Sequence, residues 1–146
     1  MAPLYFEELY VGQRFVSRGR TITETDIVIF AGLSGDYNQL HTDAEWSKNT
    51  PFKRRIAHGL LVAAIASGLM YRIGFLDGTG LAHLGTTMKF TAPVFSGDTL
   101  HVELDILSKK EIDHNRGSFT VKMDVKNQDN LVVETEQMIL IIARKP

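Results

Sequence analysis

The sequence predicts an α+β fold in which a curved antiparallel β-sheet wraps around a long central helix. The segment His58–Ile73 is apolar on nearly all sides, which is typical of a helix buried over most of its surface. The segments after it alternate apolar and polar residues, as strands with one buried face do. Breaks of hairpin length separate the last three of these segments, so we expect them to be antiparallel neighbours.

Length and composition are those of one globular domain over residues 1–146. Sixteen basic and seventeen acidic residues give a net charge of −1, which predicts no general attraction to nucleic acid or anionic membranes. Cysteine is absent, which excludes disulfides, thiolate metal sites and thiol catalysis and favours a cytoplasmic location. The segment Met1–Glu8 is acidic where a signal peptide is basic, so we expect no targeting segment.

Capping residues mark the helices expected in the first half of the chain. Thr23 is followed three residues later by Asp26, a pattern that begins helices through reciprocal side-chain capping. Asp43 can cap a further short helix, which would place Trp46 against the body of the protein. The expected elements are a strand over Gln13–Thr21, a helix over Glu24–Leu33 and a short helix over Ala44–Lys48.

The long apolar helix is expected to be followed only by strands. At 1.5 Å per residue, His58–Ile73 would be about 24 Å long, too short to span a bilayer, and Gly74 suits its end. The last strand is apolar on both faces over Met138–Ile142, which therefore needs cover on both sides. The expected strands are Leu81–Thr91, Thr99–Lys110, Ser118–Asn127 and Leu131–Ala143.

The segment Gly35–His41 carries the strongest indication of chemistry. Asp36 and His41 are five residues apart, with Asn38 between them. Turn-forming residues predict a loop here, and a loop can fold both side chains toward one point. A neighbouring carboxyl and imidazole provide an acid and a base whose proton affinities the surroundings can separate. The alternative is a capping Asp beside a structural His.

Other sites receive less support. No H-E-x-x-H or comparable ligand spacing occurs, so we predict no metal site. Ser34 lacks the second glycine of a nucleophile elbow, which disfavours a serine hydrolase. His83, His101 and His114 lie on expected strands or turns, where a structural or solvated histidine is the simpler interpretation.

Three spaced segments resemble the MaoC-like dehydratases, the (R)-specific enoyl-CoA hydratases, which have the hot-dog fold. They cover Phe30–Asp43, Ile56–Leu61 and Phe90–Asp98, and the first contains the family's Gly-Asp-x-Asn-x-x-His loop. One departure is clear, because Gln39 stands where the family usually has proline. It removes a fixed backbone angle but leaves the Asp and His in place.

The resemblance implies reversible hydration of trans-2-enoyl thioesters to (3R)-3-hydroxyacyl thioesters. Asp36 and His41 would hold one water and move its protons, as acid and base in either assignment. The backbone N–H of Gly59 would bind the enolate oxygen, since it begins the long helix, where N–H groups are free. The alternative for Gly59 is a simple helix-start glycine.

The resemblance also implies contacts with the substrate. Asn38, His58 and Ser67 would bind it or support the site, although Ser67 equally suits a packed helix as a small residue. The resemblance assigns no role to Lys53–Arg55, but the charge of this cationic run would suit the phosphates of coenzyme A or an acidic carrier protein, or a solvated charged turn. No cofactor is expected beyond the coenzyme A or acyl carrier protein that forms part of the substrate.

Two other functions remain open. A hot-dog acyl-CoA thioesterase would act on the same substrates, and a non-catalytic partner subunit would keep the fold without activity. Whichever function holds, we expect a homodimer or a dimer of dimers. A single curved sheet leaves an edge strand exposed, and family members pair their sheets edge to edge.

Overall fold

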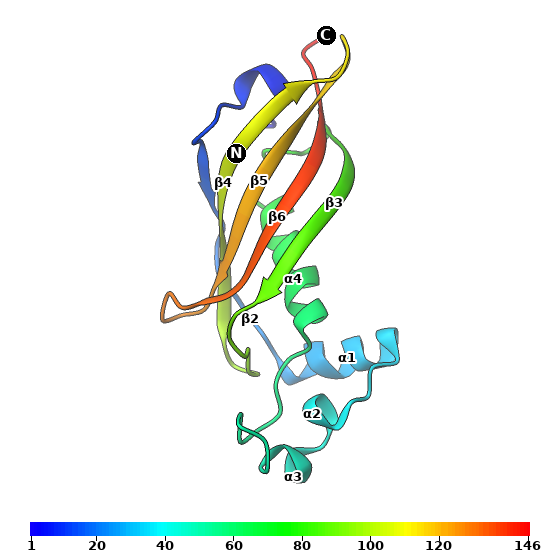
Figure 1. Ribbon diagram of the computed structural model, residues 1–146, viewed down its shortest axis with the longest axis vertical. Coiled ribbons are helices and arrows are strands. Elements are labelled where there is room, and N and C mark those ends of the chain that lie inside the picture. The colour runs from blue at the N-terminus through cyan, green and yellow to red at the C-terminus, as the bar shows by residue number, and fades with distance from the viewer.

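An antiparallel sheet of six strands forms the body of the protein (Figure 1). The computed structural model describes residues 1–146. The strand order is β1-β4-β5-β6-β3, and β2 pairs with β4 beside β1. The strands are β1 (Arg14–Val16), β2 (Arg20–Thr21), β3 (Gly80–Phe90), β4 (Thr99–Glu111), β5 (Arg116–Lys126) and β6 (Val132–Ala143). The predicted antiparallel hairpins of the last three strands are confirmed.

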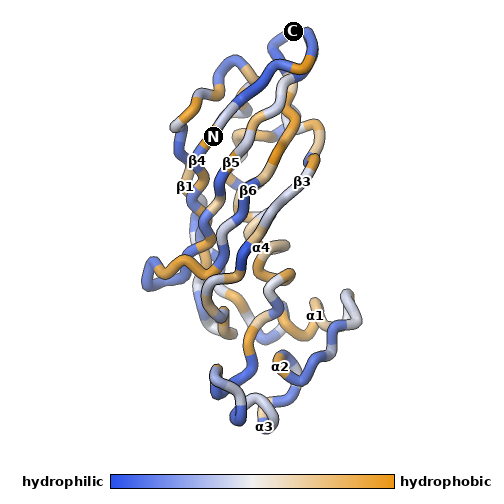
Figure 2. The backbone as a smooth tube through the Cα atoms, viewed as in Figure 1, coloured by the Kyte–Doolittle hydropathy of each residue, from blue (hydrophilic) through white to orange (hydrophobic).

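The α-helices lie on the concave side of this sheet and below one end of it, whereas the 3₁₀ turn (Phe6–Glu8) lies near the other end (Figure 1). α4 follows the concave face, whereas α1, α2 and α3 gather near the N-terminal end of α4. The helices are a 3₁₀ turn (Phe6–Glu8), α1 (Glu24–Ser34), α2 (Gln39–Thr42), α3 (Ala44–Ser47) and α4 (Gly59–Tyr71). Apolar residues dominate α4 (Figure 2), and none of the helices is long and apolar enough to cross a membrane.

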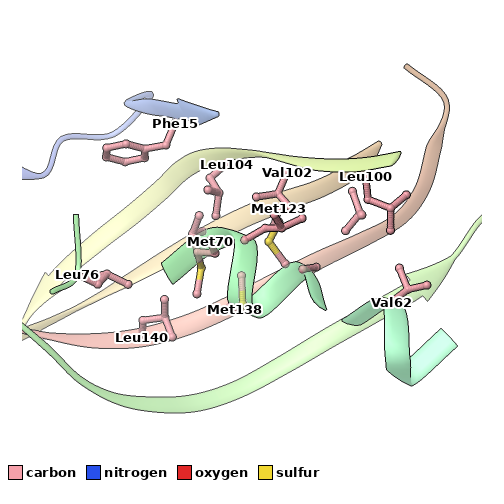
Figure 3. Close-up of a cluster of buried hydrophobic side chains, with 14 of the residues drawn as sticks. Phe15, Val62, Met70, Leu76, Leu100, Val102, Leu104, Met123, Met138 and Leu140 are labelled. Atoms are coloured by element: carbon pink, nitrogen blue, oxygen red, sulfur yellow. The ribbon is translucent and has the colours of Figure 1, made fainter. Parts of the chain in front are cut away.

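The core forms where α4 meets the inward side chains of the long strands. Alternation in β4 buries Leu100, Val102, Leu104 and Ile106, the predicted face. These residues and Met70 of α4 belong to a cluster of 26 buried apolar residues (Figure 3). Removal of this apolar surface from water is the main force that holds α4 against the concave face of the sheet.

α1 begins and ends as its sequence indicates. The Thr23 hydroxyl accepts from the Asp26 N–H, while the Asp26 carboxylate accepts from the Thr23 N–H, which completes the predicted capping box. The helix ends at Gly35, whose φ of 76° is readily adopted by glycine. This left-handed turn directs the chain into the loop that carries Asp36.

Three expectations were wrong. The first strand is divided into β1 and β2, because the Ser17 hydroxyl takes the Val102 N–H in place of a ladder carbonyl. Trp46 is 42% exposed, since α3 is a single turn that buries Ser47 instead. α4 is buried on one side only, and its other side exposes Leu60, Ala64, Ser67, Gly68 and Tyr71.

Candidate active site

A cavity of about 310 Å³ lies at the N-terminal end of α4. Fourteen residues line it, nine of them hydrophobic, so its few polar groups stand in an apolar surrounding. The structure brings together four of the predicted site residues in this wall, namely Asp36, His41, His58 and Gly59. Its apolar wall includes Leu40, Ile56, Leu60, Val62, Phe90, Val94 and Val133.

Local capping folds the Asp36 loop. The Asp36 carboxylate accepts from the Asn38 N–H at 3.2 Å, and the Asn38 side-chain oxygen accepts from the Leu40 N–H at 2.9 Å. Asn38 is thereby the N-cap of α2, the single turn that presents His41. Gln39 is the first residue of this turn, where proline and other residues are both accepted, so the departure at this position leaves the loop intact.

His41 is held in one tautomer. Its ring Nδ1–H donates to the Ile56 carbonyl at 2.8 Å, which leaves the lone pair on Nε2 free. The residue is 8% exposed, and burial is the main cause that lowers the pKa of His41, with nearby His58 acting in the same direction. The imidazole is therefore neutral at neutral pH and can accept a proton.

His58 connects the two halves of the site. Its Nε2–H donates to the backbone carbonyl of Asp36 at 2.9 Å, and its ring stacks on His41 with centroids 3.8 Å apart. It is 2% exposed, and its Nδ1 has no hydrogen-bond partner. His58 thus fixes the Asp36 loop to the start of α4 and supports the ring of His41.

The spacing of the polar groups suits a bound water. One side-chain oxygen of Asp36 and one ring nitrogen each of His41 and His58 lie within 4.8 Å of one another. Two groups that each bind one water at about 2.8 Å lie about 4.6 Å apart, whereas ligands about 2.1 Å from one zinc ion lie about 3.4 Å apart. The 4.8 Å limit includes both spacings, so it permits one water shared between these side chains.

Gly59 is the first residue of α4, and its N–H donates no hydrogen bond within the protein. A Cβ atom at this position would lie 2.8 Å from the ring of Phe90, so only glycine fits without a shift of that ring. An unpaired N–H at the positive end of a helix, beside an apolar cavity, suits a developing oxyanion.

Two predicted residues lie outside the cavity wall. Asn38 uses its side-chain oxygen to cap α2, and Ser67 is exposed on α4, about two turns or 12 Å from Gly59. Sequence reasoning missed Phe90 and Val133, which lie on neighbouring strands and complete the apolar wall. Phe90 opens the third family-like segment, whereas the only signal for Val133 was its position near the start of an expected strand.

Comparison with known proteins identifies relatives over nearly the whole chain. Residues 8–129 match the MaoC like domain family. The chain is 36% identical over 143 residues to the (R)-specific enoyl-CoA hydratase of Rhodospirillum rubrum, covering 96% of this chain and 93% of that protein.

Solved structures agree. The crystal structure of a MaoC-like dehydratase from Rhodospirillum rubrum superposes with a TM-score of 0.89 at 30% identity, covering 98% of this chain and 99% of the other. A Mycobacterium tuberculosis protein described as a double hotdog fold gives a TM-score of 0.86 at 19% identity, covering 99% of this chain and 45% of that one. The second likeness concerns the fold alone, and the hot-dog fold expected from the sequence is confirmed.

Proposed function

This chain belongs to the MaoC-like family, and we propose that it is a hydro-lyase that adds water reversibly to trans-2-enoyl thioesters, giving (3R)-3-hydroxyacyl thioesters. The observation that carries this function is the placement of Asp36 and His41 in one apolar cavity beside the unpaired N–H of Gly59. The relative from Rhodospirillum rubrum, named an (R)-specific enoyl-CoA hydratase, supports coenzyme A as the thioester carrier.

In the proposed reaction Asp36 and His41 hold one water between them. The water oxygen attacks C3 while one of its protons passes to Nε2 of His41, and the π electrons move to the thioester oxygen. The resulting enolate then takes a proton at C2 from the same pair of side chains. The product contains the water's hydroxyl on C3 and a hydrogen on C2, so atoms and charge balance.

The enolate oxygen carries negative charge only between the two steps. We assign its stabilisation to the Gly59 N–H, which is already oriented by α4 and needs no rearrangement. All acid–base groups then belong to the protein, so no cofactor is required, and coenzyme A or an acyl carrier protein enters only as part of the substrate. A cytoplasmic location fits the absence of cysteine.

We also infer that two copies of the chain associate. β3 forms one edge of the sheet, and none of its residues is buried. Apolar side chains are exposed there and on the adjoining helices, including Leu84, Phe90, Leu60 and Ile29. A second copy that pairs along β3 would satisfy the free backbone groups and cover this apolar surface. Light scattering that gives only the 16.3 kDa monomer mass for an active sample would contradict this.

A hydration assay tests the function. Decay of the absorbance band of the enoyl thioester, without release of thiol, is the expected result across a panel of acyl lengths. Thiol release would instead identify a thioesterase. Absence of any turnover on the panel would indicate a non-catalytic partner subunit.

A further inference from the structure

A second cavity, of about 260 Å³, is lined by four cationic side chains. They are Lys48, Lys53, Arg54 and Arg55, whereas Glu24 is the only carboxylate in the wall. The chain as a whole carries a net charge of −1, so this positive cavity does not reflect a generally basic surface. A site of this charge favours an anion.

The cationic cavity adjoins the active-site cavity along two chain segments. Lys53–Arg55 line the cationic cavity, and Ile56–Gly59, which follow directly, line the active-site cavity. On the opposite wall, residues 92–94 line the active-site cavity and residues 95–96 line the cationic one. A long ligand whose reacting end lies near Gly59 can therefore extend its other end into the cationic cavity.

Two of the four cations are already engaged. Arg55 pairs with Glu24 at 2.7 Å and also donates to the backbone carbonyl of His41 at 3.3 Å. Lys48 pairs with Glu45 at 2.6 Å. Arg55 thus holds the cavity wall against the turn that presents His41, so we assign these two residues to structure rather than to ligand binding.

Lys53 and Arg54 form no ion pair and remain available to an anion. The Arg54 guanidinium lies 3.7 Å from the centre of the Phe95 ring, which fixes its plane while its N–H edge stays free. Lys53 adopts a φ of 62°, a left-handed conformation that glycine or asparagine would adopt with less strain. Strained backbone of this kind tends to occur at functional positions.

We propose that this cavity binds the phosphate groups of the coenzyme A portion of the substrate, with Lys53 and Arg54 as its ligands. Arginine and lysine are the side chains that best bind phosphate, the first through its planar edge and the second as a point charge. The assignment rests on the proposed function, because that function places the thioester near Gly59 and leaves the pantetheine arm to span the two cavities.

The test compares two thioesters that carry the same acyl group. Crotonyl-CoA has the phosphates, whereas crotonyl-pantetheine lacks them. Lys53→Asn suits the left-handed backbone and removes the charge, and Arg54→Gln removes the second charge. Each variant should raise KM for crotonyl-CoA about tenfold with little change in kcat, and should leave crotonyl-pantetheine unaffected. Lys110→Asn, an exposed cation at the far end of β4, is the control for net charge.

The outcomes separate this subsite from the function itself. Equal KM values of the wild type for both thioesters, or equal losses on both in the variants, would overturn the subsite while hydration stands. If the wild type hydrates neither, calorimetry with free coenzyme A decides: weaker binding by both variants supports the subsite, and unchanged or absent binding refutes it. A crotonyl-carrier protein serves as a third substrate. If both variants also raise KM for it, the cavity binds the phosphate next to pantetheine. If KM for it is unchanged, the cavity binds the nucleotide phosphates of coenzyme A.

Discussion

Two polar clusters contain buried titratable side chains, and they differ in what surrounds them. Asp36, His41 and His58 border a cavity, and the free Nε2 of His41 is available to a ligand. Glu134 and Glu136 lie two residues apart on β6, at 0% and 6% exposure, and neither lines the active-site cavity. Both oxygens of Glu134 lack a hydrogen-bond partner.

Burial acts on both clusters but shifts their pKa values in opposite directions. It lowers the pKa of His41 and raises the pKa of Glu134 to about 8, with Glu136 adding to the second shift. Each group is driven to its neutral form, as expected for removal of charge from water. The neutral imidazole of His41 can exchange a proton with a molecule in the cavity. The carboxyl of Glu134 is enclosed by protein and borders no part of this cavity. The two clusters therefore differ in whether a molecule from solution can reach the titrating group.

The largest effect is expected from the cluster beside the cavity. Asp36→Asn and His41→Ala should each lower kcat about 10²–10⁴-fold, since each removes a group that moves a proton of the bound water. Thermal unfolding measured on the same samples should show folded proteins. Near-native rates in both variants would remove the distinction between the two clusters.

A pair of substitutions at Gly59 isolates the backbone N–H. Gly59→Ala and Gly59→Pro both introduce a Cβ that must displace the ring of Phe90, but only proline removes the N–H. Proline is accepted at the first helical position, so α4 should remain folded. We expect kcat of the proline variant to be about 10²–10³-fold below that of the alanine variant, with a much smaller difference in substrate affinity. Equal kcat values would show that the thioester oxygen is bound elsewhere.

Several of these features were predictable because they depend on local sequence. Alternation in β4, the capping box of Thr23 and Asp26, and the approach of Asp36 to His41 follow from periodicity and turn chemistry within a few residues. The closeness of Phe90 to Gly59 was not predictable, because it depends on how β3 packs against α4 across 31 residues of sequence.

Burial was the least predictable property. The two carboxyls of β6 continue the inward face of the strand, where alternation alone would place apolar residues, and no local pattern reveals that they are enclosed. The exposed side of α4 looks like core in the sequence, because its apolar residues have the same composition as those that face the sheet.

The smallest effect is expected at the closed cluster, which is the pair Glu134 and Glu136 on β6, and it concerns stability. The folded pKa of about 8 for Glu134 exceeds the ordinary value of 4.5, so the folded state retains a proton that the unfolded chain releases. This stabilisation is present below about pH 4.5 and is lost as pH rises through 8. Glu134→Gln cannot lose a proton, so its melting temperature should match that of the wild type near pH 4.5 and exceed it by a few degrees at pH 8.

The control for this comparison is Glu45→Gln, at an exposed carboxyl that pairs only with Lys48. Its melting temperature should follow the wild type at every pH. Loss of activity in Glu134→Gln as large as that in Asp36→Asn would mean that the closed cluster takes part in the reaction after all.

The central claim is that one water, held between Asp36 and His41, supplies both groups added to the double bond. Both side chains border the same cavity with their polar atoms no more than 4.8 Å apart, so hydroxyl and hydrogen should reach one face of the substrate. Hydration of crotonyl-CoA in D₂O, followed by NMR of the product, measures this directly. We predict syn addition, with one deuterium at C2 on the face that carries the C3 hydroxyl. Anti addition would place the C2 proton donor on the opposite wall and contradict the account.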